Sequence, residues 1–144
     1  MAKVSFTMPD EFLDSLSRLE SQTDVILPRV LEAGGKVVYK IVRSNLQSSI
    51  GRNLKFKSRS TGELVNALGV SPARLDRKGN YNVKIGFREP RRKGEASNAM
   101  LANLIEYGKH GQPPKPFLKP SKSQSRSPAI EAMKQKMDEE IKRL

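Results

Sequence analysis

Apolar residues recur at helical spacing near the beginning of the chain. The first series falls within residues 10–22, where an acidic first turn suits the positive end of a helix dipole. Its apolar positions are Phe12, Leu13, Leu16 and Leu19. The pattern predicts an amphipathic helix that begins near Asp10 and covers a core.

A second apolar series follows within residues 24–50. Because proline is tolerated only in the first turn of a helix, Pro28 predicts that this second helix is separate from the first. The adjacent glycines Gly34 and Gly35 each weaken a helix by roughly 1 kcal/mol relative to Ala, so we expect a kink or a break there.

Strict alternation of apolar and polar residues occurs between Tyr81 and Phe87 and predicts a strand with one buried face. Its partner is expected within Leu68–Leu75, joined through the turn-rich residues 76–80. An isolated hairpin is marginal in water, so this one must pack on the helices or pair with strands of a neighbouring subunit.

A third helix is expected over residues 96–107, with Ser97 as its N-cap and Gly108 as its end. Its predicted apolar face consists of Met100, Leu101, Leu104 and Ile105. Residues 109–127 show no periodicity, and the prolines between Pro113 and Pro120 predict an extended arm that continues as a polar linker.

Ser127 and Pro128 form a good start for a terminal helix. One apolar stripe is predicted for it, made of Ile130, Met133, Met137, Ile141 and Leu144. The length of the chain predicts a single domain over residues 1–144, in which helices precede and follow a hairpin near residues 68–87. A basic loop (51–62) and the proline-rich arm (108–127) are expected to be flexible.

The net charge of +12 is concentrated in two blocks. Residues 36–60 contain seven basic and no acidic side chains, and residues 91–126 contain eight basic and two acidic ones. Such blocks suit a nucleic acid or an acidic protein surface, and they also suit a loop that charge keeps solvated. The sequence leaves these alternatives open.

Catalytic chemistry finds little support. The chain has no cysteine and one histidine, His110, which falls in the proline-rich arm without the preorganisation that general-base catalysis needs. No phosphate-binding glycine loop is present, and Gly34-Gly35 lacks the preceding strand. We therefore expect no enzyme, cofactor or metal. No apolar run is long enough for a signal peptide or a membrane span, so we expect a protein made in the cytoplasm or in a particle assembled there.

Two classes remain, a nucleic-acid-binding module and an assembly protein. The charge suits the first, but the sequence has no helix-turn-helix, zinc-finger or ribonucleoprotein motif. The arm around Phe117 suits the second, because an extended segment can pair with a neighbour while an aromatic side chain fills a pocket.

Three pieces in order resemble the family of small head-to-tail joining proteins of long-tailed bacteriophages and prophages, also called neck, tail-completion or minor tail-component proteins. They are Thr61-Gly62-Glu63-Leu64 with Leu68, then Ala102–Gly108 (ANLIEYG), then Pro116–Pro120 (PFLKP) before a C-terminal helix. The resemblance spans roughly residues 30–144. It departs in that the family's last proline leads directly into a helix, whereas a polar linker, Ser121–Ser127, is predicted here.

The resemblance implies an α+β domain in which helices pack a small antiparallel sheet. It also implies a structural virion protein of the connector between portal and tail, which is present in the host cytoplasm during assembly. In the virion it would form a ring of identical subunits, and a monomer in solution is compatible with this. It would contact head-closure and tail-terminator proteins, and no membrane would be involved. The implied subunit interface comprises Glu106, Tyr107, Gly108, Pro116, Phe117, Leu118 and Pro120. Phe117 would be an apolar plug, with packing of Tyr107 and Phe117 in their own core as the alternative.

Six basic residues are candidates for facing DNA in such a channel: Lys55, Lys57, Arg59, Arg91, Arg92 and Lys93. The alternative function is a basic protein that binds nucleic acid independently of sequence, with an affinity that falls steeply with salt.

Overall fold

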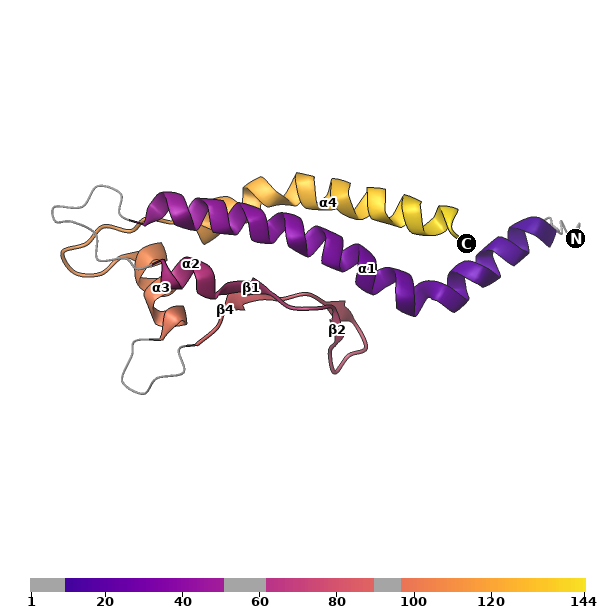
Figure 1. Ribbon diagram of the computed structural model, residues 1–144, viewed down its shortest axis with the longest axis horizontal. Helices are drawn as coiled ribbons and strands as arrows, with labels where there is room; N and C mark the ends of the chain where they lie inside the picture. Colours follow the sequence, from indigo (N-terminus) through magenta and orange to yellow (C-terminus); the bar gives the residue numbers. More distant parts are fainter. Residues whose placement is uncertain (1–9, 51–61, 90–96) are drawn as a thin grey trace, which may run out of the picture.

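The computed structural model describes residues 10–50, 62–89 and 97–144. Its elements are α1 (Asp10–Ser49), α2 (Glu63–Ala67), β1 (Leu68–Val70), β2 (Arg74–Leu75), β3 (Tyr81–Asn82), β4 (Ile85–Phe87), α3 (Asn98–Tyr107) and α4 (Leu118–Lys142). In Figure 1, α4 lies along one side of α1, and the strands with α2 and α3 lie along the other side. The predicted α+β class is confirmed.

α1 is one continuous helix of 40 residues, so the prediction of two separate N-terminal helices is wrong. Pro28 lies inside it, and Figure 1 shows α1 bent in its N-terminal part. A proline removes one backbone hydrogen bond and crowds the preceding turn, which accounts for a bend. The flanking Ile26 and Val30 are both buried, and their burial offsets this cost.

The Gly34-Gly35 pair does not break α1 either. A Cβ atom at Gly34 would lie 2.7 Å from Cγ of Met133 in α4, and one at Gly35 would lie 2.8 Å from Cγ1 of Val83 in the hairpin. The two glycines therefore let α4 and the hairpin approach α1 from two sides. Packing on both sides overrides the low helix propensity of glycine.

The predicted hairpin is confirmed, including its turn, but the strand predicted from Tyr81 to Phe87 is interrupted at residues 83–84 and forms the short strands β3 and β4. β1 pairs antiparallel with β4 in the register Leu68–Phe87, and β2 pairs with β3 in the register Leu75–Tyr81. In the turn, Oδ1 of Asp76 accepts the N–H groups of residues 78 and 80. The hairpin packs on α1 of its own chain, as one of the two expected arrangements.

The main buried core lies at the C-terminal end of α1, where α2, β1, α3 and the residue that precedes α4 contribute to it. Its members are Val42, Leu46, Val65, Leu68, Ala102 and Phe117. Val65 belongs to α2, a short helix that the sequence analysis did not predict.

α3 forms as predicted, and the Ser97 side chain caps it by accepting the N–H of Met100. Its predicted apolar face is right in part, because Leu104 and Ile105 are half-buried and Ile105 packs against the core, but it is wrong at Met100 and Leu101. The buried positions are Asn98, Ala102 and Glu106, whereas Met100 and Leu101 are exposed. Asn98 is tolerated inside because its side-chain amide donates to the carbonyl oxygen of residue 88, so its burial leaves that group paired.

α4 begins at Leu118, so the polar linker predicted for Ser121–Ser127 is wrong, and the helix follows Pro120 directly. Pro128 lies within α4 and does not start it. The predicted apolar stripe is also wrong at Ile130 and Ile141, which are exposed.

The face that α4 turns to α1 carries small residues instead, namely Ser121, Ser125 and Ala129. Small side chains let the two helix backbones come close, and Oγ of Ser121 accepts a hydrogen bond of 2.8 Å from the Asn45 side chain of α1. A serine-rich segment that composition marks as a linker is thus the contact face of a helix.

Candidate assembly interface

The centre of the predicted interface is a junction between the end of α3 and the start of α4. The carboxylate of Glu106 in α3 accepts three backbone hydrogen bonds from the first residues of α4. Oε2 accepts the N–H groups of Phe117 (2.7 Å) and Leu118 (2.8 Å), and Oε1 accepts that of Lys119 (3.0 Å). The start of a helix presents unpaired N–H groups and a partial positive charge, and one carboxylate satisfies both.

Pro120 completes this arrangement. The next position in the first turn of α4 would need another acceptor, but proline has no N–H group to satisfy. The Ser121 hydroxyl then donates to the carbonyl oxygen of Phe117, and its own N–H donates to the same oxygen. The Pro-Phe-Leu-Lys-Pro stretch is therefore a helix start that Glu106 caps from a distance in sequence.

Burial of the Glu106 carboxyl alone would raise its pKa, because desolvation disfavours the charged form. The hydrogen bonds from residues 117–119, with the nearby charge of Lys119, outweigh that effect and hold the pKa below its usual value of 4.5. Glu106 is thus an anion at neutral pH.

Phe117 is fully buried in the core of its own chain. Its ring meets that of Phe87 edge to face, with centroids 6.4 Å apart and an angle of 78° between the planes. This is the alternative that the sequence left open for Phe117. In this structure it is an internal anchor and not a plug available to a neighbour.

Gly108 turns the chain between the two helices. Its φ of 76° lies in the left-handed region, and a Cβ there would lie 2.7 Å from the backbone nitrogen of Pro114. Gly108 donates its N–H to the carbonyl oxygen of Leu104, and further along Lys115 donates to that of Ile105 (both 2.8 Å). The loop 108–117 is therefore bonded back to α3.

The remaining predicted interface residues point outward. Tyr107 is 75% exposed, which contradicts the alternative of Tyr107 in its own core, and Leu118 and Pro116 are exposed as well. The structure thus divides the predicted set into an inner pair, Glu106 and Phe117, and an outer group that the inner pair positions.

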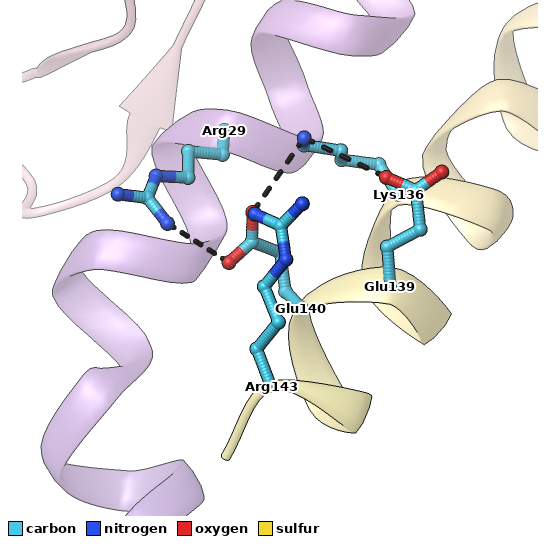
Figure 2. A network of polar contacts seen from close by, with 5 residues as sticks. All are labelled: Arg29, Lys136, Glu139, Glu140 and Arg143. Carbon is cyan, nitrogen blue, oxygen red and sulfur yellow. Dashed lines mark hydrogen bonds and ion pairs between the residues drawn. The ribbon is translucent and has the colours of Figure 1, made fainter.

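The other end of α4 holds a second buried glutamate, which the sequence analysis missed. Figure 2 shows Glu140 among three cations, Arg29 from α1 and Lys136 and Arg143 from the end of α4. Arg29 Nη1 donates to Oε2 at 2.9 Å, while Lys136 Nζ and Arg143 Nη1 lie 3.6 and 3.8 Å from Oε1.

Desolvation raises the pKa of the Glu140 carboxyl, but the hydrogen bond and charge of Arg29, with the charges of Lys136 and Arg143, outweigh it and lower that pKa. A pocket of about 340 Å³ beside the cluster is lined by Arg18, Arg29 and Arg143 among others. An i, i+4 charge pattern within α4 signals Lys136–Glu140 from sequence, but nothing local signals the partner at Arg29.

The six residues predicted to face DNA, Lys55, Lys57, Arg59, Arg91, Arg92 and Lys93, lie outside the described residues. In the described part of the chain, no three His, Cys, Asp or Glu side chains are grouped so that they could hold a metal ion. No helix in these same ranges has the length and apolar character that a membrane span requires.

Comparison with known families gives one match. A family model described as "Bacteriophage HK97-gp10, putative tail-component" matches residues 10–108. The matched range runs from the start of α1 to the Glu-Tyr-Gly end of α3, and it stops before Phe117 and α4. Neither the curated proteins nor the solved structures contain a match to the chain.

Proposed function

Because the chain belongs to the HK97-gp10-like family of phage tail components, we propose that it is a subunit of the connector between head and tail. The family itself supports a structural role in a bacteriophage and a place in the virion. In our proposal, identical subunits form a ring between the head-closure proteins and the tail.

The observation that carries this proposal is a set of exposed apolar side chains on α3, a helix that also buries two polar ones. The helix buries Asn98 and Glu106 and exposes Met100, Leu101 and Tyr107. Exposed apolar side chains that gather on one element favour a protein–protein contact, and tyrosine and methionine are enriched at such contacts. Leu118, at the start of α4, is exposed as well.

The inner pair gives this outer group its rigidity. Glu106 fixes the end of α3 against the start of α4, and Phe117 anchors the loop between them in the core. Tyr107 and Leu118 follow these two anchored residues directly in sequence. A contact surface whose side chains are already positioned loses less entropy when it binds.

The experiment replaces Tyr107 by Ser in the phage that encodes this chain, and examines the particles by negative-stain electron microscopy. We expect a protein that melts as the parent does but leaves heads and tails unjoined. The matched control is Leu75→Ser in β2, because Leu75 is also well exposed but lies on the hairpin.

Joined, infectious particles from the Tyr107→Ser phage would remove the contact role of the α3 surface. Joined particles whose tails have an abnormal length would instead favour a role within the tail and contradict the connector.

A further inference from the structure

The N-terminal end of α1 projects beyond the rest of the fold (Figure 1). Next to the C-terminal end of α4, Arg143 and Leu144 line a pocket together with Arg18 of α1. Residues 10–17 come before Arg18 in α1 and thus lie beyond the end of α4, and we call them the α1 arm. Figure 1 shows no other helix or strand of the chain lying alongside the arm.

The arm is acidic and partly apolar. It carries three carboxylates and no basic residue, and the Leu13 side chain is 46% exposed. Acidic residues in a first turn favour the helix itself. The exposed Leu13 gives the arm one apolar side chain beside the carboxylates of Asp10 and Asp14, which is complementary to a surface that is both apolar and basic.

Such a surface lies on the other half of the molecule. Neither residues 33–49 of α1 nor residues 118–130 of α4 contain an acidic side chain, and together they carry six basic ones. These are Lys36, Lys40, Arg43, Lys119, Lys122 and Arg126. The long helical pair is thus acidic at one end and basic at the other.

This basic half also contains a depression with an exposed apolar side chain, which we call the seat. Ile130 is exposed on α4 and lines a depression of about 310 Å³ between Arg126 and Lys134. Glu131 also lines it, so two cations and one anion surround the exposed isoleucine. On α4, Arg126 and Lys134 lie one helical turn to either side of Ile130, and on the arm Asp10 and Asp14 share one helix face with Leu13.

The arm cannot reach this seat within one chain. Gly34 of α1 packs on Met133, so Ile130 lies beside the middle of α1. Leu13 is about 20 residues earlier on the same helix, which at 1.5 Å per residue separates the two sites by roughly 30 Å. An arm that reaches this depression must therefore belong to another copy of the chain.

We propose that the arm of one copy docks on α4 of the next copy. Leu13 enters the depression at Ile130, while Asp10 and Asp14 pair with Arg126 and Lys134. The two surfaces differ, so the contact is heterologous and generates a ring when its rotation closes. This inference rests on the proposed ring and names the contact that builds it.

The test exploits the lack of cysteine in the chain. Two single-cysteine proteins, Leu13→Cys and Ile130→Cys, are purified, mixed at high concentration and oxidised. We expect a mixed disulfide dimer in clear excess over both homodimers. A pair with Leu75→Cys in place of Ile130→Cys is the control, because Leu75 is even more exposed than Ile130 (59% against 40%) but lies on the hairpin.

Charge reversal sharpens the test. Asp10→Lys with Asp14→Lys in the first protein should abolish the mixed dimer, and Arg126→Glu with Lys134→Glu in the second should restore it. Reversal of Lys78 and Lys84 on the hairpin should leave it unchanged. Circular dichroism of each variant confirms folding.

A dominant Leu13→Cys homodimer, or no mixed dimer between folded proteins, overturns the proposal. The outcome is separable from that of the proposed function. A mixed dimer with normal head-to-tail joining in a phage that carries the arm reversal would contradict the connector role and keep the contact. Unjoined particles without a mixed dimer would do the opposite.

Discussion

The two ends of α4 are joined to the rest of the fold by different kinds of contact. At each end a buried glutamate joins α4 to the rest of the fold. At its start, Glu106 from α3 accepts three backbone N–H groups beside the buried Phe117. At its C-terminal end, Glu140 belongs to α4 itself and faces the cations of Arg29, Lys136 and Arg143, two of them well exposed.

The difference lies in how strictly each arrangement depends on geometry. Backbone N–H groups of a first helical turn point in fixed directions, so Glu106 is satisfied only if α3 and α4 meet at one angle. Long arginine and lysine side chains reach Glu140 from several positions, and water and salt screen them. The start of α4 should therefore dominate the stability of the fold, and the C-terminal end should tune it.

The largest effect is expected for Phe117→Ala. Removal of a fully buried aromatic ring leaves a cavity in the shared core and should lower the free energy of unfolding by about 3–5 kcal/mol. Urea denaturation followed by circular dichroism measures the loss. The neighbour Leu118→Ala is the control, and an equal loss there would contradict the central place given to Phe117.

Glu106→Ala should follow. It leaves the N–H groups of residues 117–119 without their acceptor and should cost about 1–3 kcal/mol, with Glu106→Gln between this variant and the parent. The same unfolding measurement applies. Glu131→Ala, which truncates an exposed glutamate of α4, should change stability by less than about 0.5 kcal/mol. If the two alanine variants unfold alike, the capping role of Glu106 is lost.

Low pH should destabilise the fold through both Glu106 and Glu140, because each carboxyl has a folded-state pKa below its usual value of 4.5. A lowered pKa gives stability that is present in full above the unfolded-state pKa and disappears as the pH falls through the folded-state pKa. The urea concentration at the unfolding midpoint should therefore decrease as the pH is lowered below about 5. Glu106→Gln should flatten this fall, and an unchanged slope would speak against the lowered pKa of Glu106.

The smallest effect is expected for Glu140→Gln, and it should depend on salt. High salt should reduce the difference between this variant and the parent, because the partners of Glu140 are partly exposed cations. The loss caused by Glu106→Ala should persist under the same conditions. Unfolding in low and high sodium chloride tests the contrast, with Arg29→Gln as the partner in a double-mutant cycle.

Patterns of neighbouring residues correctly predicted the hairpin and the two ends of α3, because short-range interactions determine these features. The hairpin follows from alternation between Tyr81 and Phe87 and from the turn before it, and the start and end of α3 follow from Ser97 and Gly108. The family resemblance, carried by its ordered motifs, agrees with the family that matches residues 10–108. For the site, the sequence picked Glu106 and Phe117, but it assigned Phe117 to a neighbour's pocket first and to its own core second.

Contacts between distant segments decided the remainder. Pro28 and Gly34-Gly35 stay within one helix because α4 and the hairpin pack against it, and no local rule includes that packing. The serines of α4 are a contact face because a neighbouring helix approaches them closely, and composition alone cannot distinguish this from a linker.

The sequence by itself determined the hairpin, the limits of α3, the uneven distribution of charge and the poverty of catalytic groups, since each depends on neighbouring residues or on a count. Only the tertiary structure decided which face of α3 and α4 is buried. That choice depends on whether a polar side chain finds a partner inside the fold. Glu106 finds three N–H groups 11 to 13 residues away, and its burial turns Tyr107 outward.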